Sequence, residues 1–342
     1  MIEPLITEAK NQPQRSSRIY FCGKPAALAT VNLKSLSKEK RDAIRKLHRL
    51  EDRHNTRILI FFALWGAAVY AALTLKAFGA QALSCLAIVC ALVGFSVLLH
   101  EASHRLLFKR PTLNYWLGLL CGLPVLLSVS GFRTNHLAHH ERRSSMGDAD
   151  DVGANFRDST GSTLFYYLSI LIRAYGFLAY LPLIGLTQGN WKMRAKALSE
   201  YALMAACCAV AFRLFPTDAV LKLWIIPLLI SAHLTEFRAV AEHGLTTRGN
   251  TFTATRTVVS NRAVSFVMCN INYHLEHHLF PAVPWYNLPK VNRLLQDEYR
   301  RVGCSVYPSY TEFFIDFFKA SWRGIIPNAR LIPEEMRKEA CL

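Results

Sequence analysis

Histidines gather in three short clusters along the chain. The chain has 12 histidines among 342 residues, and eight of them stand three or four positions from another histidine. Residues with this spacing share one face of a helix. Each cluster is therefore predicted to point its imidazoles in one direction from a helix. The clusters are His100-Glu-Ala-Ser-His104, His136-Leu-Ala-His139-His140 and His274-Leu-Glu-His277-His278.

The spacing indicates a metal centre rather than scattered structural histidines. A random chain of this composition would contain an H-x-x-H-H motif only about 0.015 times, and this chain contains two. Neutral imidazole binds iron, zinc, copper and nickel, so the ligand type leaves the metal open. A structural zinc site closes with four ligands, whereas eight histidines are enough for two metal ions. Neither cysteine nor clustered glutamate accompanies them, unlike the ligand sets of the soluble carboxylate di-iron bundles.

Polar side chains beside the clusters are candidates to orient the ligands. A metal-bound imidazole usually donates its other N–H group to a carboxylate or a carbonyl. His48, His54 and His233 have no partner at ligand spacing, and we expect them to be packing residues. The candidates to orient the ligands are Glu101, Glu276, Asn272 and Asp148, with Asn135, Asn270, Asp150 and Asp151 nearby.

The composition points to a membrane protein. Hydrophobic residues make up 52% of the chain and charged residues only 19%, against about 25% charged residues in soluble domains. The formal net charge is +16. Thirteen lysines and arginines lie between Lys10 and Arg57, directly before the first long apolar run, as the positive-inside rule predicts for a cytoplasmic segment. Since no zinc-finger spacing, RNP motif or basic heptad accompanies them, nucleic acid is not an expected partner.

Four apolar runs are predicted to cross the membrane as two hairpins. A bilayer core of roughly 30 Å needs about 20 helical residues. Residues 58–75 and 77–99 form the first predicted hairpin, and the first histidine cluster follows it directly. Residues 201–215 and 219–234 form a second, shorter hairpin around a turn that contains Pro216. The nine cysteines are expected to be reduced, because their number is odd and no C-x-x-C pair occurs.

Two further apolar segments contain glycine, proline or arginine and are expected to be re-entrant or interfacial. They are residues 112–130 and 163–186, the latter with Arg173 and Pro182. If all histidine clusters face the same side, an even number of crossings must separate them, which favours four spans. Residues 38–57 have the composition of an interfacial helix with a basic face. Expected anchors at the membrane interface follow the third cluster, at Phe280, Trp285 and Tyr286.

The predicted architecture is an all-α integral membrane protein. Two transmembrane helical hairpins, four spans in all, are combined with re-entrant or interfacial helices and a cytoplasmic histidine-rich cap. Residues 1–57 are expected to form a basic cytoplasmic segment, 58–320 the membrane and catalytic domain, and 321–342 a cytoplasmic tail. Both termini and the catalytic site are expected on the cytoplasmic side, because the predicted outer turns carry few charges.

The order and placement of the clusters resemble the membrane fatty acid desaturase family over about residues 55 to 320. The segments that carry the resemblance are HEASH, HLAHH and NYHLEHHLFPAVPWYNLPK. The resemblance implies two iron ions that activate O2 at the cytoplasmic face, with removal of hydrogens from an inert hydrocarbon chain. It also implies a further histidine between the last hairpin and the third cluster. Ala241-Glu242-His243-Gly244 fits that position, so His243 becomes a ninth expected ligand, although Ala239 stands where some relatives have a polar residue.

The function implied is an O2-dependent di-iron desaturase that introduces a double bond into a fatty acyl chain. Two electrons per turnover must come from elsewhere, because the sequence has no haem-binding His-Pro-Gly-Gly motif, ferredoxin cysteine pattern or G-x-G-x-x-G motif. A separate ferredoxin, or cytochrome b5 with its reductase, is the expected donor at the basic cytoplasmic face. The third cluster begins with His274. Similar proteins with glutamine at this position are front-end desaturases, so the histidine indicates a methyl-end or simple acyl-lipid desaturase.

Two other functions stay open from the sequence. A hydroxylase or ketolase on the same scaffold would act on an alkane, a carotenoid or a sphingoid lipid, and the spacing of the clusters does not distinguish it from a desaturase. A polyhistidine metal transporter or sensor is disfavoured, because it would need ligands within the membrane spans.

Overall fold

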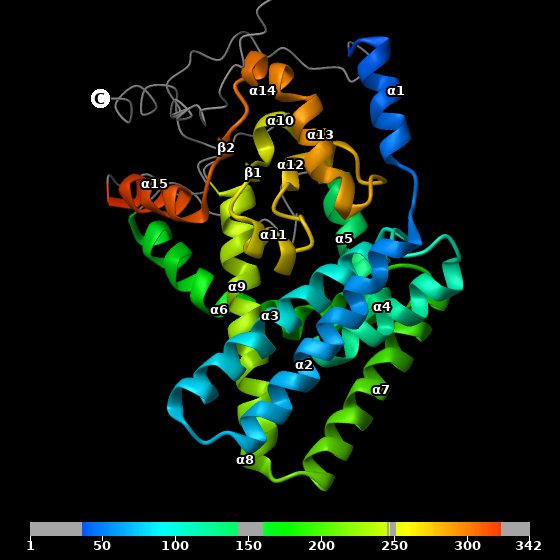
Figure 1. The fold of residues 1–342 in the computed structure, drawn as a ribbon, viewed down its shortest axis with the longest axis vertical. Helices are drawn as coiled ribbons and strands as arrows, with labels where there is room; N and C mark the ends of the chain where they lie inside the picture. The colour runs from blue at the N-terminus through cyan, green and yellow to red at the C-terminus, as the bar shows by residue number, and fades with distance from the viewer. Residues whose placement is uncertain (1–35, 143–159, 245, 247–250, 323–342) are drawn as a thin grey trace, which may run out of the picture.

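The computed structural model describes residues 36–142, 160–244, 246 and 251–322, and nearly all of its regular structure is helical. Long helices fill the lower part of the molecule, and short elements form a cap over one end of them (Figure 1). The histidine clusters lie between the long helices and the cap.

The first predicted hairpin is present. It consists of α2 (Thr56–Thr74) and α3 (Phe78–Ser103), which follow α1 (Lys38–Leu47) and the short 3-10 helix η2 (Asp52–Asn55). The amide of Gln81 donates to the carbonyl of Ala72 at 2.8 Å, so it satisfies an otherwise free carbonyl at the end of α2. Helix α3 continues beyond the apolar run that predicted it and carries the first histidine cluster.

Helices α4 (Pro111–Val125) and α5 (Val129–Arg142) meet at a bend of 97°, inside the segment expected to be interrupted. Leu126 has a left-handed φ of 55° at this bend. The indole N–H of Trp224 donates to the carbonyl of Pro124 at 2.7 Å. A hydrogen bond from a residue distant in sequence therefore stabilises the bend.

Helix α6 (Thr160–Thr187) differs from its prediction. It is continuous across the residues that were expected to interrupt it, Arg173 and Pro182. The guanidinium of Arg173 lies 2.7 Å from the carboxylate of Glu236 on α9 (Ile226–His243), so the charge is paired inside the helix bundle. This ion pair depends on the tertiary fold and is not visible in the sequence. The sequence therefore predicted an interrupted segment where the structure has a continuous helix.

Helices also occupy both runs of the second predicted hairpin, but they are longer than predicted. Helix α7 starts ten residues before the predicted run, and the last helix ends nine residues after it. The added residues include Glu200 and Glu242, whose carboxylates are buried and hydrogen-bonded. The elements are α7 (Trp191–Leu214), α8 (Thr217–Val220), the π-helical stretch η4 (Leu221–Ile225) and α9 (Ile226–His243).

Five described helices are long and apolar enough to cross a membrane, one more than the four spans predicted, and the bent pair α4 and α5 would make a sixth. The additional helix is α6. The five stretches are Asp52–Thr74, Phe78–Ser103, Ile170–Thr187, Trp191–Leu214 and Thr217–His243.

The cap is built from short elements after α9. Strands β1 (Thr257–Val258) and β2 (Val306–Tyr307) pair in parallel, so the described chain is not purely helical. The elements of the cap are α10 (Thr251–Ala254), β1 (Thr257–Val258), α11 (Arg262–Val267), α12 (His274–Leu279), η5 (Trp285–Asn287), α13 (Leu288–Leu294), α14 (Gln296–Val302), β2 (Val306–Tyr307) and α15 (Tyr310–Trp322).

Helix α1 packs against the cap. Its Ile44 is buried, and the ammonium group of Lys40 lies 2.9 Å from both carboxylate oxygens of Glu298 on α14. The amide of Asn287 donates to the carbonyl of Leu47 at 2.8 Å. One face of the helix predicted at the membrane interface is therefore covered by protein.

Candidate metal centre

All nine predicted histidine ligands come together between the long helices and the cap. They come from four helices that are distant in sequence: α3, α5, α9 and α12. Their side-chain nitrogens divide into two neighbouring groups. The five-histidine group consists of His100, His104, His136, His140 and His277, and the four-histidine group consists of His139, His243, His274 and His278.

In the five-histidine group the ring nitrogens converge on one point. One ligand nitrogen from each residue lies within 4.8 Å of the others. The Nε2 atoms of His104 and His136 are 2.8 Å apart, and the Nε2 of His140 is 3.0 Å from those of His136 and His277. A set of imidazole nitrogens that face one another in this way can surround a single cation.

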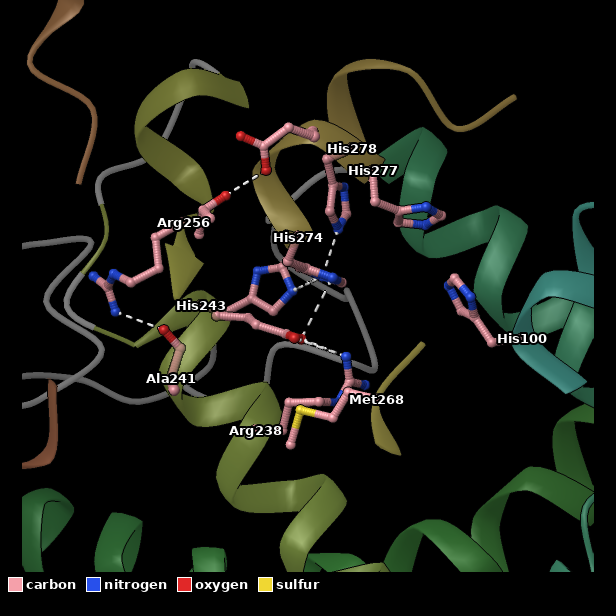
Figure 2. Close-up of polar contacts among 12 residues, drawn as sticks. His100, Arg238, Ala241, His243, Arg256, Met268, His274, His277 and His278 are labelled. Carbon is pink, nitrogen blue, oxygen red and sulfur yellow. Dashed lines mark hydrogen bonds and ion pairs between the residues drawn. The ribbon is translucent and has the colours of Figure 1, made fainter. Parts of the chain in front are cut away.

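The four-histidine group is less compact: one ligand nitrogen from each of His139, His243 and His278 lies within 4.8 Å of the others, and His274 adjoins this set through His243 and His278. The Nε2 of His274 lies 3.0 Å from the Nε2 of His243 and 3.0 Å from that of His278, as the dashed lines in Figure 2 show. The ring of His139 lies 5.3 Å from that of His243 and 5.1 Å from that of His278. The rings of His140 and His278 are 4.6 Å apart, so the two groups adjoin.

The histidines of one helix do not all serve the same group, contrary to the prediction that each cluster points one way. On α5, His136 and His140 belong to the five-histidine group, whereas His139 belongs to the other. On α12 the arrangement is reversed, with His277 alone in the five-histidine group. Residues at i and i+4 stay together and the residue at i+3 crosses over, because positions i+3 and i+4 are about 100° apart around a helix.

The electrostatics of the site suit a cation. Burial, together with neighbouring histidines, holds the pKa of His274, His277 and His278 well below the usual 6.5. Burial lowers the pKa of His104 to about 4. These imidazoles are therefore neutral at pH 7 and keep a free lone pair for a metal. The Nε2 atom of His100 is buried and has no hydrogen-bond partner in the described part of the chain, as a ligand atom without its metal would be.

Of the candidates to orient the ligands, Glu101 contacts an imidazole. Its Oε1 lies 3.2 Å from Nδ1 of His100, and its Oε2 accepts the backbone N–H of Trp285 at 3.3 Å. Glu101 is fully buried. This geometry fits a carboxylate that fixes the orientation and the protonated nitrogen of His100.

Glu276 and Asn272 have other partners. The carboxylate of Glu276 accepts hydrogen bonds from Asn292 and from Tyr299, both at 2.7 Å, and from Thr257. Burial raises the pKa of Glu276, while these donors oppose the increase. The amide of Asn272 donates to the backbone of β1. Both side chains hold α12 and the residues before it against other elements of the cap, and their role in orienting a ligand stays a prediction.

The remaining acidic candidates cannot be placed. Asp148, with Asp150 and Asp151, lies outside the described residues.

Glu242 lies beside a ligand, although no sequence pattern singled out this carboxylate. Its Oε2 is 3.5 Å from Nδ1 of His274. The Nη1 of Arg238 donates to both carboxylate oxygens of Glu242, at 2.7 and 2.9 Å. Figure 2 shows Arg238 below His243 and His274, on the side of the membrane helices. The only indication of this role in the sequence is that Glu242 directly precedes the predicted ligand His243.

A buried arginine holds the end of α9. Arg256 is fully buried, and its Nη1 donates to the carbonyl of Ala241 at 2.9 Å (Figure 2). Burial lowers the pKa of this guanidinium to about 10, so it stays charged at pH 7. A cation near the last carbonyl groups of a helix is favourable. Arg256 therefore stabilises the turn that presents His243.

The three aromatic residues expected at the membrane interface lie in different surroundings. Trp285 is only 2% exposed, so it is a core residue rather than an anchor. Tyr286 stacks on His54 with ring centroids 3.9 Å apart. Phe280 meets His48 edge to face at 6.5 Å. These contacts join the N-terminal elements to the cap.

His233 lies outside both groups. Its ring packs 4.7 Å from that of Tyr175 and 6.5 Å from that of Phe237. None of the clusters of possible metal ligands among the described residues contains it. It is therefore a suitable control position for the ligand histidines.

Comparison with known proteins places these observations in a family. The chain is 26% identical to the sphingolipid delta(4)-desaturase DES1 of Drosophila melanogaster over 64% of its own length and 66% of the relative. It is 27% identical to the human sphingolipid delta(4)-desaturase/C4-monooxygenase DES2, over 59% of this chain and 61% of the relative. It is 24% identical to the sn-1 oleoyl-lipid 12-desaturase of Arthrospira platensis, over 62% and 66%.

The chain spans 61% to 66% of the length of these relatives. The family model for fatty acid desaturases matches residues 77–310. This match includes all nine histidines of the two groups and both predicted hairpins except for α2. The chain belongs to the fatty acid desaturase family.

Proposed function

We propose that this protein is an O2-dependent di-iron membrane desaturase that introduces a double bond into the acyl chain of a lipid. The observation that carries the proposal is the division of nine buried or half-buried imidazoles into two adjoining groups. Two groups of four or five neutral nitrogens fit two metal ions, and a single structural zinc site would need only four ligands. The family match supports lipid oxidation as the chemistry.

The proposed ligands are the nine histidines of the two groups. Iron bound there supplies the oxidising power that side chains lack for removing hydrogen from an unactivated methylene group. The protein holds the imidazoles neutral by burial and orients His100 through Glu101, and it places the carboxylate of Glu242 beside His274. A lipid chain would approach the site from the membrane along the apolar helices that end there.

The proposed orientation places the histidine groups on the cytoplasmic side. The turn between α2 and α3 and the turn between α7 and α8 lie at the lower end in Figure 1, opposite the cap. Helices α1 and α15, which begin and end the described chain, lie toward the cap. The basic segment before α2 would then face the cytoplasm, as the positive-inside rule requires. A separate ferredoxin, or cytochrome b5 with its reductase, would deliver electrons from that side.

Hydroxylation is a second candidate. The human relative is named as both a desaturase and a C4-monooxygenase, and both reactions begin with hydrogen removal from the same type of methylene group. The two outcomes differ in the product, since hydroxylation adds oxygen to the chain and desaturation does not.

The test is expression in a host without the activity, followed by mass spectrometry of labelled acyl lipids and sphingolipids. We expect a product two mass units lighter than its precursor, and a product 16 units heavier would establish hydroxylation instead. The purified protein should contain close to two irons per chain. The His277→Ala variant should give no product, and the matched His233→Ala variant should give a product level close to that of the wild type. Full activity with zinc alone, or with one iron, would contradict the di-iron proposal.

A further inference from the structure

Glu200 is a buried carboxylate in the middle of a helix that is long and apolar enough to cross a membrane. It lies on α7 and is 1% exposed. Ionisable residues in such helices are costly to bury and usually have a function with a specific partner. Glu200 lies outside both histidine groups, so its partner must be sought elsewhere.

The partner of Glu200 is the first turn of α5. The hydroxyl groups of Ser128 and Ser130 both donate to the carboxylate, the latter to Oε1 at 2.6 Å. The backbone N–H of Ser130 donates to Oε2 at 3.0 Å. The Oγ of Ser128 also accepts the backbone N–H of Gly131 at 2.9 Å. One carboxylate from α7 thus holds three donors around the start of another helix.

This arrangement matches the needs of a helix N-terminus. The first N–H groups of a helix have no partner within it, and its positive end attracts an anion. The carbonyl of Ser128 accepts the N–H of Phe132 at 2.8 Å, so Ser128 is the residue that begins the hydrogen bonding of α5. Glu200 satisfies a backbone donor of that first turn from a different helix. Bonds to an ionised carboxylate are about twice as strong as those between neutral groups.

A second contact fixes the same turn without charge. A Cβ atom built on Gly185 of α6 would lie only 3.0 Å from the Cα of Gly131. A Cβ atom built on Gly131 would lie 3.2 Å from both Ser128 Oγ and Tyr201 Oη. Backbone approaches this close need glycine. The turn that starts α5 is therefore held between α6 and α7.

Helix α5 carries ligands for both histidine groups. His136 and His140 belong to the five-histidine group and His139 belongs to the four-histidine group. A shift of α5 along or around its axis would move all three imidazoles together. Its other end leads directly to residues outside the described part of the chain, so the described anchor is the one at Ser128–Gly131.

We propose that Glu200 is a positioning residue for the metal centre: it anchors the first turn of α5 and so sets the location of His136, His139 and His140. The part of this inference that concerns iron rests on the proposed function. The anchoring of α5 does not depend on it and can be measured in metal-free protein.

The test compares two changes that act on the same turn by different means. Glu200→Gln removes the charge and one acceptor oxygen, and Gly185→Ala pushes on Gly131 without altering any polar group. Ser199→Ala is the control on α7, because Ser199 is exposed and bonds only within its own helix turn. Gly176→Ala is the control on α6, because an added Cβ there meets nothing within 4 Å.

Three quantities should be measured on detergent-purified protein that elutes as a single species. They are hydrogen exchange of peptides from α5 in metal-free protein, the rate of iron release to a chelator, and the Mössbauer spectrum of the loaded protein. We expect faster exchange in α5, about 10-fold faster iron release and altered Mössbauer parameters in Glu200→Gln and Gly185→Ala. Both control variants should match the wild type.

The outcomes separate the two proposals. Unchanged exchange in α5 for both test variants would overturn the anchoring role. Faster exchange with unchanged iron release and spectra would overturn the link from anchor to metal centre. If the wild type binds no iron while exchange in α5 still responds, the proposed function fails and the anchor stands. If Glu200→Gln does not fold, Gly185→Ala carries the same test.

Discussion

The two histidine groups are built alike but supported differently. In each, a buried glutamate next to a ligand in sequence lies close to the Nδ1 atom of one imidazole: Glu101 to His100 and Glu242 to His274. Glu101 is held by the backbone N–H of Trp285, whereas Glu242 is held by the guanidinium of Arg238.

This difference predicts two metal ions with different properties. A carboxylate that receives a hydrogen bond from an imidazole raises the basicity of that ligand. Arg238 neutralises part of the charge of Glu242, so we expect His274 to be a weaker electron donor than His100. The five-histidine group also has one more imidazole. We infer that the four-histidine group holds its metal less tightly.

The largest effect should come from removing a histidine that crosses between groups. In His277→Ala or His139→Ala a group loses a ligand supplied by a helix whose other histidines serve the second group. Since loss of a residue that merely supports a ligand costs about 10–100-fold, we expect no detectable product and less than two irons per chain. Product analysis and iron content check this, and His233→Ala should keep most of both. Substantial activity in either crossing variant would contradict the grouping.

Unequal ligand number gives a sharper comparison. His243→Ala leaves three histidines in the four-histidine group, whereas His104→Ala leaves four in the other. We expect His243→Ala to lose close to one iron during dialysis against a chelator and His104→Ala to lose its iron more slowly. Iron content against dialysis time measures the difference. Equal losses would show that the two groups bind with similar strength.

The supporting carboxylates should have smaller, unequal effects. Glu101→Gln and Glu242→Gln are each expected to lower activity about 10–100-fold. The effect at Glu242 should be the larger, because the change leaves the Arg238 cation half-buried beside His274 without its partner. Adding Arg238→Met to Glu242→Gln should then recover part of the iron affinity. Iron titration of the wild type, Glu101→Gln, Glu242→Gln and the double variant measures these affinities. A double variant that binds iron more weakly than Glu242→Gln alone would refute this explanation.

Acid should weaken both groups together. The folded protein holds the pKa of His104 at about 4 and those of His274, His277 and His278 well below 6.5, while the unfolded chain binds protons near 6.5. The unfolded state therefore gains more protons as the pH falls, so stability is present above pH 6.5 and decreases below it. The Tm of metal-free protein should fall between pH 7 and pH 4. A Tm independent of pH in this window would show that these imidazoles are not held neutral.

The smallest effect on the metal should come from Glu276. Its partners are Thr257, Asn292 and Tyr299. Glu276→Gln therefore disrupts buried hydrogen bonds within the cap but removes no contact to a histidine ligand. We expect a loss of about 1–3 kcal/mol in the free energy of unfolding, with iron content unchanged in folded protein. Thermal unfolding with iron analysis tests this. Loss of iron with an unchanged free energy of unfolding would show that Glu276 supports a ligand of the metal centre.

Much of the metal centre was predictable because its pattern is local. The spacing of His100 and His104, or of His136 and His140, is a property of one helix and can be read from the sequence. The apolar runs that became α2 and α3 are similarly local, since length and hydropathy decide whether a helix can cross a bilayer. His243 has no histidine neighbour and was found through the family resemblance alone.

The tertiary structure decided what depends on distant partners. Arg173 looked like an interruption in an apolar segment, and Glu200 lay just outside a predicted run, but Arg173 pairs with Glu236 on α9 and Glu200 binds the start of α5. The same reason explains why Glu276 bonds to residues of the cap and why Glu242 lies beside His274. The sequence determined which helix each imidazole stands on. Which of two neighbouring groups it enters depends on how four helices pack around a common point, and no local spacing contains that information.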